Sequence, residues 1–283
     1  MPVASYQFTV SLNRQLATGN KQPTTDLTNY TSILHRIRYK RLILRSQESA
    51  MSLKDQGQQL VYKGINPLIS LLLKLGITPN MITMFGLILN FVATIILIIG
   101  AEEGDRTDHS YIGWAGLVIL IAGLFDMIDG RLARIGNMAN PFGALFDSVI
   151  DRYSEMVMFL GIIWYLVSHD YFLSSIFAFV AMIGSVMVSY TRARAEGLGV
   201  ECSVGLMQRP ERILIIGISA MICGFFSANY GGDFKFSPDW APIPVFETIS
   251  FFTLPLAILA ILANVTAIQR LNFSRKVLME RKN

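Results

Sequence analysis

The stretch "DMIDGRLARIGNMANPFGALFDSVID", residues 126–151, places four aspartates beside strongly apolar sequence. Asp126 and Asp129 end one expected helix, and Asp147 and Asp151 begin the next, with the short polar turn "IGNMANPF" between them. Residues three or four apart share a helical face, about 60° or 40° apart in rotation. Because a short turn makes the two helices antiparallel neighbours, we expect all four carboxylates to converge at one depth.

The chain around this stretch is typical of a membrane protein. Apolar residues make up 52% of its 283 residues and charged residues only 16%, against about 25% charged in soluble domains. A helix needs about 20 apolar residues to span a bilayer. Six segments meet this requirement, and they predict an all-α integral membrane fold: residues 80–101, 111–133, 143–167, 171–195, 210–229 and 247–270.

The charges of the loops predict how the spans are oriented. The C-terminal segment "RLNFSRKVLMERKN" is basic, whereas the loop "AEEGDRTDHS" is acidic. Lys and Arg in short loops favour the cytoplasmic side, so we expect both termini, and the aspartates, at the cytoplasmic face of the cell membrane. Nucleic acid is excluded as a partner, because no basic stripe lies outside this membrane context.

Four segments are expected along the chain. Residues 1–50 are a polar and basic extension, which is either disordered or precedes the true start at Met51. Residues 51–76 have the apolar spacing of a juxtamembrane amphipathic helix. The six-helix domain covers 77–272, with Asn80 expected to cap its first helix, and 273–283 form a basic cytoplasmic tail.

Four aspartates at the edge of the bilayer indicate a site for divalent cations. One Asp costs about 2.5 to 3.5 kcal/mol at a bilayer centre and less near the surface. Hard cations such as Mg²⁺ or Mn²⁺ prefer carboxylate oxygens, and two ions would offset the charge of a bound pyrophosphate. Gly130 and Gly143 would let a phosphate or nucleotide approach the backbone. The alternative is a structural network in which Arg131, Arg134 and Arg152 neutralise the aspartates.

The stretch resembles the signature of the CDP-alcohol phosphotransferase (phosphatidyltransferase) family, D-x2-D-G-x2-A-R-x8-G-x3-D-x3-D. The matching residues are Asp126, Asp129, Gly130, Ala133, Arg134, Gly143, Asp147 and Asp151. The resemblance extends over residues 51–270. It implies an enzyme that displaces CMP from a CDP-linked lipid with an alcohol.

The same resemblance implies a role for each matching residue. Asp126, Asp129, Asp147 and Asp151 would hold two Mg²⁺ or Mn²⁺ ions, and Asp151 would also act as general base on the acceptor hydroxyl. The residues that would line the site of the CDP-lipid are Asn80, Thr83, Gly130, Ala133, Arg134 and Asn140.

The arginines near the aspartates favour an acceptor with its own phosphate, because guanidinium groups suit phosphate oxygens. Those expected at the same face are Arg152, Arg192, Arg194, Arg209 and Arg212, and positive-inside topology is the alternative explanation for each. Arg192 and Arg194 lie about 200° apart on a helix, so one would bind substrate while the other serves topology. The resemblance to inositol-phosphate enzymes described next implies that Arg152, Arg192 and Arg194 bind the acceptor phosphate, with Arg212 as a further candidate.

Two further stretches resemble the phosphatidylinositol phosphate synthases, "GALFDSVIDRYSE" and "SYTRARAEGLGVECSVGLMQRPERIL". This resemblance implies that CDP-diacylglycerol and inositol 1-phosphate are the substrates. Ser148 and Arg152 stand where glycerol-phosphate enzymes typically have Pro and Lys. The alternatives are glycerol 3-phosphate, inositol or serine as acceptor, and outside this chemistry a transporter or a non-catalytic scaffold. A homodimer is common in the family.

Overall fold

The fold is taken from a computed structural model, which describes residues 64–236 and 246–281. The extension expected at 1–50 and the first part of the helix expected at 51–76 lie outside the described residues. Within the expected helix, residues Gly64–Lys74 are helical, and a turn with Gly76 at φ +69° follows them.

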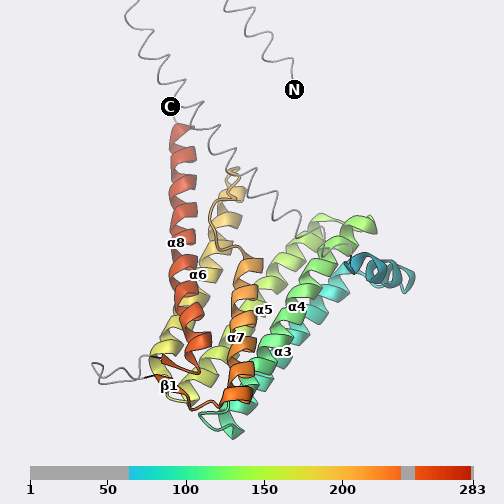
Figure 1. The fold of residues 1–283 in the computed structure, drawn as a ribbon. Coiled ribbons are helices and arrows are strands. Elements are labelled where there is room, and N and C mark those ends of the chain that lie inside the picture. Colours follow the sequence, from blue (N-terminus) through green and yellow to red (C-terminus); the bar gives the residue numbers. More distant parts are fainter. Residues whose placement is uncertain (1–63, 237–245, 282–283) are drawn as a thin grey trace, which may run out of the picture. The chain divides into compact units, whose positions relative to one another are not determined.

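Six long helices make up the described part of the chain (Figure 1). Their bounds are α3 Pro79–Glu103, α4 Ser110–Ile135, α5 Pro141–Ser168, α6 Phe172–Gly197, α7 Arg209–Tyr230 and α8 Ser250–Glu280. Each expected apolar segment lies within or overlaps one of them. Because α8 continues to Glu280, most of the segment expected as a basic tail is helical.

Five of these helices are long and apolar enough to cross a membrane, namely α3, α4, α6, α7 and α8. The sixth, α5, carries four charged residues up to its middle, namely Asp147, Asp151, Arg152 and Glu155, which leaves too short an apolar run for the same criterion. The prediction of an all-α membrane fold is confirmed. The count of six spans stays a prediction that depends on α5.

Successive helices run in opposite directions, so six helix ends meet on one side of the bundle (Figure 1). These are the first turns of α3, α5 and α7 and the last turns of α4, α6 and α8. Helix α4 packs on α3 and α7, and α6 packs on α8. Gly113 and Gly224 let α4 and α7 touch, because a Cβ added to Gly224 would lie 2.4 Å from the Cα of Gly113.

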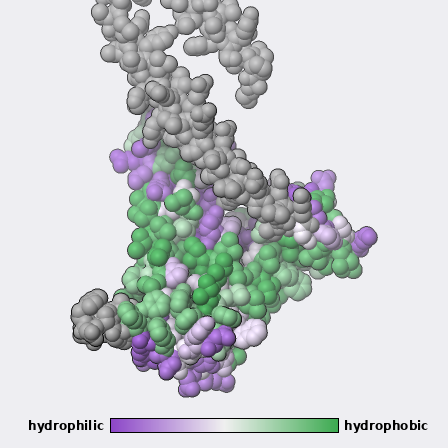
Figure 2. Space-filling model, viewed as in Figure 1, coloured by the Kyte–Doolittle hydropathy of each residue, from purple (hydrophilic) through white to green (hydrophobic). Residues whose placement is uncertain are grey.

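The bundle presents apolar side chains on its outside, as expected of a surface that faces lipid. Phe85, Leu160 and Ile261 are among the exposed large apolar residues, and Figure 2 shows hydrophobic residues over the middle of the helices. The end opposite the aspartates carries a short antiparallel pair, β1 Lys235–Phe236 with β2 Phe246–Glu247.

One expected detail of the first helix is wrong. Asn80 was expected at the cap of the helix, but the cap is Thr78, with Pro79 as the first helical residue. Proline suits that position because its missing N–H would have no helical partner there. Asn80 therefore lies inside the first turn of α3 and is available to the cavity described below.

Candidate active site

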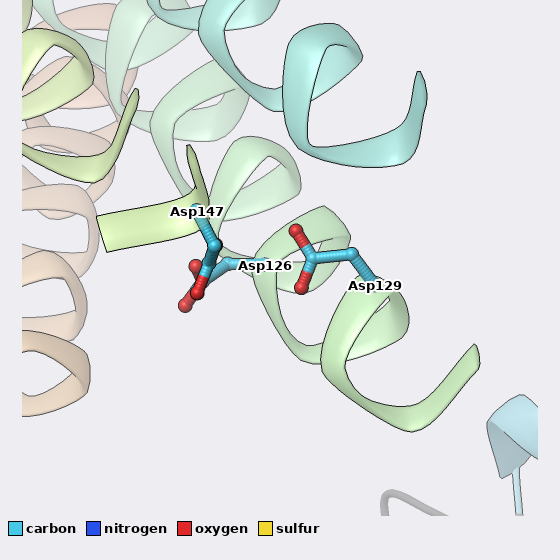
Figure 3. A group of neighbouring side chains, drawn as sticks. All are labelled: Asp126, Asp129 and Asp147. Carbon is cyan, nitrogen blue, oxygen red and sulfur yellow. The ribbon is translucent and has the colours of Figure 1, made fainter. Parts of the chain in front are cut away.

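Three of the four aspartates of the opening stretch form one cluster. Asp126 and Asp129 come from the second half of α4, and Asp147 comes from the first turns of α5. Each offers a carboxylate oxygen within 4.8 Å of the others, and Figure 3 shows the three carboxylates directed toward a shared space. The short turn after α4 brings these helix ends together, as the spacing predicts.

The fourth aspartate, Asp151, lies one turn further along α5 and contacts an arginine. Its Oδ1 forms an ion pair with Nη1 of Arg209 at 2.7 Å, and the same Nη1 donates a hydrogen bond to Oδ1 of Asp126. The guanidinium of Arg209 therefore links Asp151 to the cluster of three. All four aspartates thus belong to one connected group of charges.

Thr83 of α3 holds one carboxylate of the cluster in place. Its hydroxyl lies 2.7 Å from Oδ2 of Asp129 and 3.1 Å from the carbonyl oxygen of Pro79. Both oxygens are acceptors, and the contact with the carboxylate is the shorter one. We therefore assign the hydroxyl proton of Thr83 to the hydrogen bond with Asp129. Asp129 itself is buried.

A cavity of about 600 Å³ opens beside the cluster between α3, α4 and α5. It contains every residue expected at the site of the CDP-lipid, namely Asn80, Thr83, Gly130, Ala133, Arg134 and Asn140, together with Asp129 and Asp147. The amide of Asn140 also caps α5, since its Oδ1 accepts from the backbone N–H of Gly143 at 2.8 Å. Nε of Arg134 donates to the carbonyl of Gly130 at 2.9 Å.

A second cavity, of about 480 Å³, lies on the other side of Asp151, between α5, α6, α7 and α8. Five arginines line it: Arg152, Arg192, Arg209, Arg212 and Arg270. Its acidic residues are Asp151, Glu155 and Glu196. The cavity beside Gly130 is lined by Asp129 and Asp147 and the arginine-rich cavity by Asp151, so both border the group of four aspartates.

Two expected arginines of the arginine-rich cavity already have partners. Nη1 of Arg152 donates to Oγ of Ser148 at 2.5 Å. Nε of Arg192 donates to Glu196 at 2.8 Å in an exposed pair. Such exposed pairs contribute at most about 1 kcal/mol, so a bound anion can replace this partner at little cost.

Arg212 is held much more firmly. Its Nε and Nη2 donate to the two oxygens of Glu155 at 2.8 and 3.0 Å, and its Nη1 donates to the carbonyl of Met207 at 3.1 Å. Both side chains of the pair are almost fully buried. The pair joins α5 to α7 and fixes the wall of the cavity, and only the N–H groups that remain can reach a ligand.

Arg194 lies apart from the other expected residues. It lines a separate, mostly apolar groove between the ends of α6 and α8, with Tyr190, Leu271 and Arg275 among its neighbours. The spacing argument that Arg192 and Arg194 face different surroundings agrees with this placement. Binding of an acceptor by Arg194 has no support from the arrangement of the described side chains.

Three residues that line the arginine-rich cavity received no role in the sequence analysis. Arg209 was noted at the start of a span but given no role, Glu155 was overlooked, and Arg270 was counted with the tail. Arg270 is buried and donates to the carbonyls of Val204 and Val188 at 2.9 and 2.8 Å. A charged residue inside an apolar helix was the signal available for both Glu155 and Arg270.

The residues of the cluster fit a divalent cation. Three carboxylates supply the hard oxygen ligands that Mg²⁺ and Mn²⁺ prefer. Oδ1 of Asp147 is buried and has no hydrogen-bond partner within the described residues, and a cation would satisfy it. Asp126 and Asp151 are close enough to share one further positive charge, since one nitrogen of Arg209 contacts both.

Comparisons with known proteins identify the family and relatives with the same fold. A family model described as CDP-alcohol phosphatidyltransferase matches residues 76–266. A phosphatidylinositol phosphate synthase of Mycobacteroides abscessus is 34% identical over 166 residues, which cover 58% of this chain and 71% of that protein.

Solved structures of the phosphatidylinositol phosphate synthase of Mycobacterium tuberculosis share the fold. One with CDP-DAG bound is 25% identical, covers 74% of this chain and 92% of that chain, and has a TM-score of 0.58. Another, in complex with manganese and citrate, is also 25% identical, covers 74% of this chain and 87% of that one, and has a TM-score of 0.57.

Proposed function

The chain belongs to the CDP-alcohol phosphatidyltransferase family, and from that premise we propose that it makes phosphatidylinositol phosphate. It transfers the phosphatidyl group of CDP-diacylglycerol to inositol 1-phosphate and releases CMP. The observation that carries the proposal is that two cavities border the group of four aspartates, one beside Gly130 and one lined by five arginines.

The cavity beside Gly130 is the proposed site of the CDP-lipid. Asp126, Asp129 and Asp147 would hold the divalent cations, together with Asp151, as the proposal of two Mg²⁺ or Mn²⁺ ions requires. When bound, such ions neutralise the diphosphate and stabilise the leaving CMP. Gly130 leaves room for the nucleotide, since a Cβ there would meet no atom closer than 3.9 Å.

Asp151 is the proposed general base. It lines both the space among the aspartates and the arginine-rich cavity, so an acceptor hydroxyl in that cavity can reach its carboxylate. Asp151 would remove the hydroxyl proton as the oxygen attacks the phosphorus that carries the lipid, and the bond from this phosphorus to CMP breaks.

The five arginines favour an acceptor that carries a phosphate. They exceed the three acids of the same cavity, and guanidinium groups bind phosphate oxygens in pairs. Arg152 and Arg192 are the proposed contacts, with Arg212 in a supporting position. Glycerol 3-phosphate carries a phosphate as well and is the second candidate, whereas free inositol and serine do not account for the arginines.

The reaction is tested with purified protein, CDP-diacylglycerol, Mg²⁺ and the four acceptors in parallel, with CMP release as the readout. We expect turnover with inositol 1-phosphate and its loss in Asp151→Asn. Arg152→Ala should raise KM for the acceptor far more than KM for the CDP-lipid. Turnover with glycerol 3-phosphate alone would overturn the acceptor, and folded protein without any turnover would overturn the enzyme.

The location and the oligomeric state of the protein are also proposed. The chain is a multi-pass membrane protein, and the charges of its loops support a cytoplasmic membrane with the aspartates on the cytoplasmic side. A homodimer is proposed from the family resemblance. Light scattering of the detergent-solubilised protein tests the dimer, and labelling of a single cysteine placed at Asn137 in intact cells tests the orientation.

A further inference from the structure

Arg209 stands at the junction of the two cavities. It is the first residue of α7 and is followed by Pro210, so its backbone is fixed at the start of the helix. Its side chain lines both the narrow space among Asp126, Asp129 and Asp151 and the arginine-rich cavity. A rotation of this side chain alone would move a positive charge from one space to the other.

The contacts of Arg209 differ from those of the neighbouring Arg212. Nη1 of Arg209 contacts Asp126 and Asp151, while its buried Nε has no hydrogen-bond partner within the described residues. Arg212, one helical turn later, is locked by both oxygens of Glu155 and by a carbonyl. Arg209 is therefore held mainly by the two aspartates and can leave when they find another cation.

We propose that Arg209 is an exchangeable counter-ion of the metal site. It offsets part of the negative charge of Asp126 and Asp151 until a divalent cation binds their oxygens, and it then turns into the arginine-rich cavity, where it binds the phosphate of the acceptor. This inference rests on the proposed function, because it requires the divalent cations and the phosphorylated acceptor. Binding of the divalent cation and binding of the acceptor phosphate then both depend on the side chain of Arg209.

The physical reason is the balance of charge. One guanidinium offsets one of the two negative charges of these carboxylates, whereas a divalent cation offsets both. A cation bound to the same oxygens would also repel the guanidinium at close range. The phosphate of an acceptor offers the released guanidinium a new anion. Metal binding and phosphate binding should then favour each other, and by linkage the coupling is equal in both directions.

The first measurement is Mn²⁺ binding to purified protein, followed by calorimetry and by the electron paramagnetic resonance of free Mn²⁺. The variants are Arg209→Met and, as a control, Arg194→Met, which removes an arginine charge at the same end of the bundle but outside both cavities. Arg209→Met should tighten the weaker Mn²⁺ step about 5- to 150-fold, the usual size of coupling between two sites. Arg194→Met should leave both steps unchanged.

The second measurement titrates inorganic phosphate, the probe for the arginine-rich cavity, with and without Mn²⁺. Wild-type protein should bind phosphate more tightly when Mn²⁺ is present. Part of this gain comes from direct attraction to the metal and will remain in every variant. The part carried by Arg209 should disappear in Arg209→Met and persist in Arg194→Met, so an equal gain in both variants would overturn the exchange.

The outcomes separate this inference from the function on which it rests. Wild-type protein that binds no Mn²⁺ would refute the proposed metal site itself. Wild-type binding with unchanged or weaker Mn²⁺ affinity in Arg209→Met would refute only the exchange and make Arg209 a fixed structural partner. If the Met variant does not fold, as judged by its melting curve, Arg209→Gln takes the same test, with the same expected direction.

Discussion

The hydroxyl of Thr83 donates a 2.7 Å hydrogen bond to Oδ2 of Asp129, and so links α3 to the carboxylate cluster of α4. Residues that support metal ligands in this way fix the direction of the ligand, and their loss typically weakens metal binding about 10- to 100-fold. We expect Thr83→Val to reduce Mn²⁺ affinity by this amount while the fold is kept. Calorimetric titration with Mn²⁺ measures the change.

A matched control for that substitution lies on the same helix. Thr94 is also buried in α3, and its hydroxyl donates a 2.7 Å hydrogen bond to the carbonyl of Val157, away from the aspartates. Thr94→Val should leave Mn²⁺ affinity unchanged. If both variants bind Mn²⁺ alike, the hydroxyl of Thr83 has no part in the metal site.

Gly130→Ala separates binding of the CDP-lipid from stability. A Cβ at this position would meet no atom closer than 3.9 Å, and replacing a helical glycine by alanine stabilises by about 0.5 to 1 kcal/mol. The same Cβ would project into the cavity proposed for the CDP-lipid. We therefore expect an unchanged or higher Tm together with a higher KM for CDP-diacylglycerol.

The control for Gly130→Ala is Gly197→Ala at the end of α6. A Cβ there also has open space around it, and Gly197 does not line the cavity proposed for the CDP-lipid. This variant should keep the wild-type KM for both substrates. A Gly130→Ala enzyme with wild-type KM for CDP-diacylglycerol would place the nucleotide elsewhere.

The sequence was sufficient to predict the aspartate cluster because the information is local. Asp126, Asp129 and Asp147 are separated by one short turn, and helical spacing alone sets which sides they face. The apolar runs likewise predicted each long helix, since both length and apolar content follow from the thickness of a bilayer.

The arginines were harder to predict, because their surroundings depend on helices far apart in the chain. Arg209 reaches Asp126 across 83 positions, and Arg270 reaches Val188 across 82. Helical spacing could separate Arg192 from Arg194, but it could not say which of them faces the aspartates. It also gave no sign that Glu155 would bind Arg212 and leave it with few donors for a ligand.

The buried pair of Glu155 and Arg212 should matter for stability more than its exposed counterpart. Removing one partner of such a pair typically costs about 3 to 5 kcal/mol, because the other charge stays buried. We expect Glu155→Leu to lower the free energy of unfolding by this amount, and Glu155→Leu with Arg212→Met to recover most of it. Denaturant titration in detergent measures both.

The exposed pair of Arg192 and Glu196 is the control for the buried one. Glu196→Gln should change the free energy of unfolding by at most about 1 kcal/mol, the usual limit for pairs in solvent. Equal losses in Glu155→Leu and Glu196→Gln would show that burial adds nothing to the pair of Glu155 and Arg212.

His109 should make the fold sensitive to acid at the end opposite the aspartates. Burial, and next the nearby His169, lower the pKa of His109 from 6.5 to about 4, and Asp108 acts against this shift. Below pH 6.5 the unfolded chain therefore binds a proton that the folded chain does not, so stability falls between about pH 6.5 and pH 4. At 1.36 kcal/mol per pH unit, the loss of stability reaches about 3 kcal/mol.

Unfolding of the wild-type protein and of His109→Gln across this pH range measures the loss. The variant should lack this part of the slope, while other groups contribute equally to both proteins, so parallel pH profiles would assign the acid sensitivity to residues other than His109.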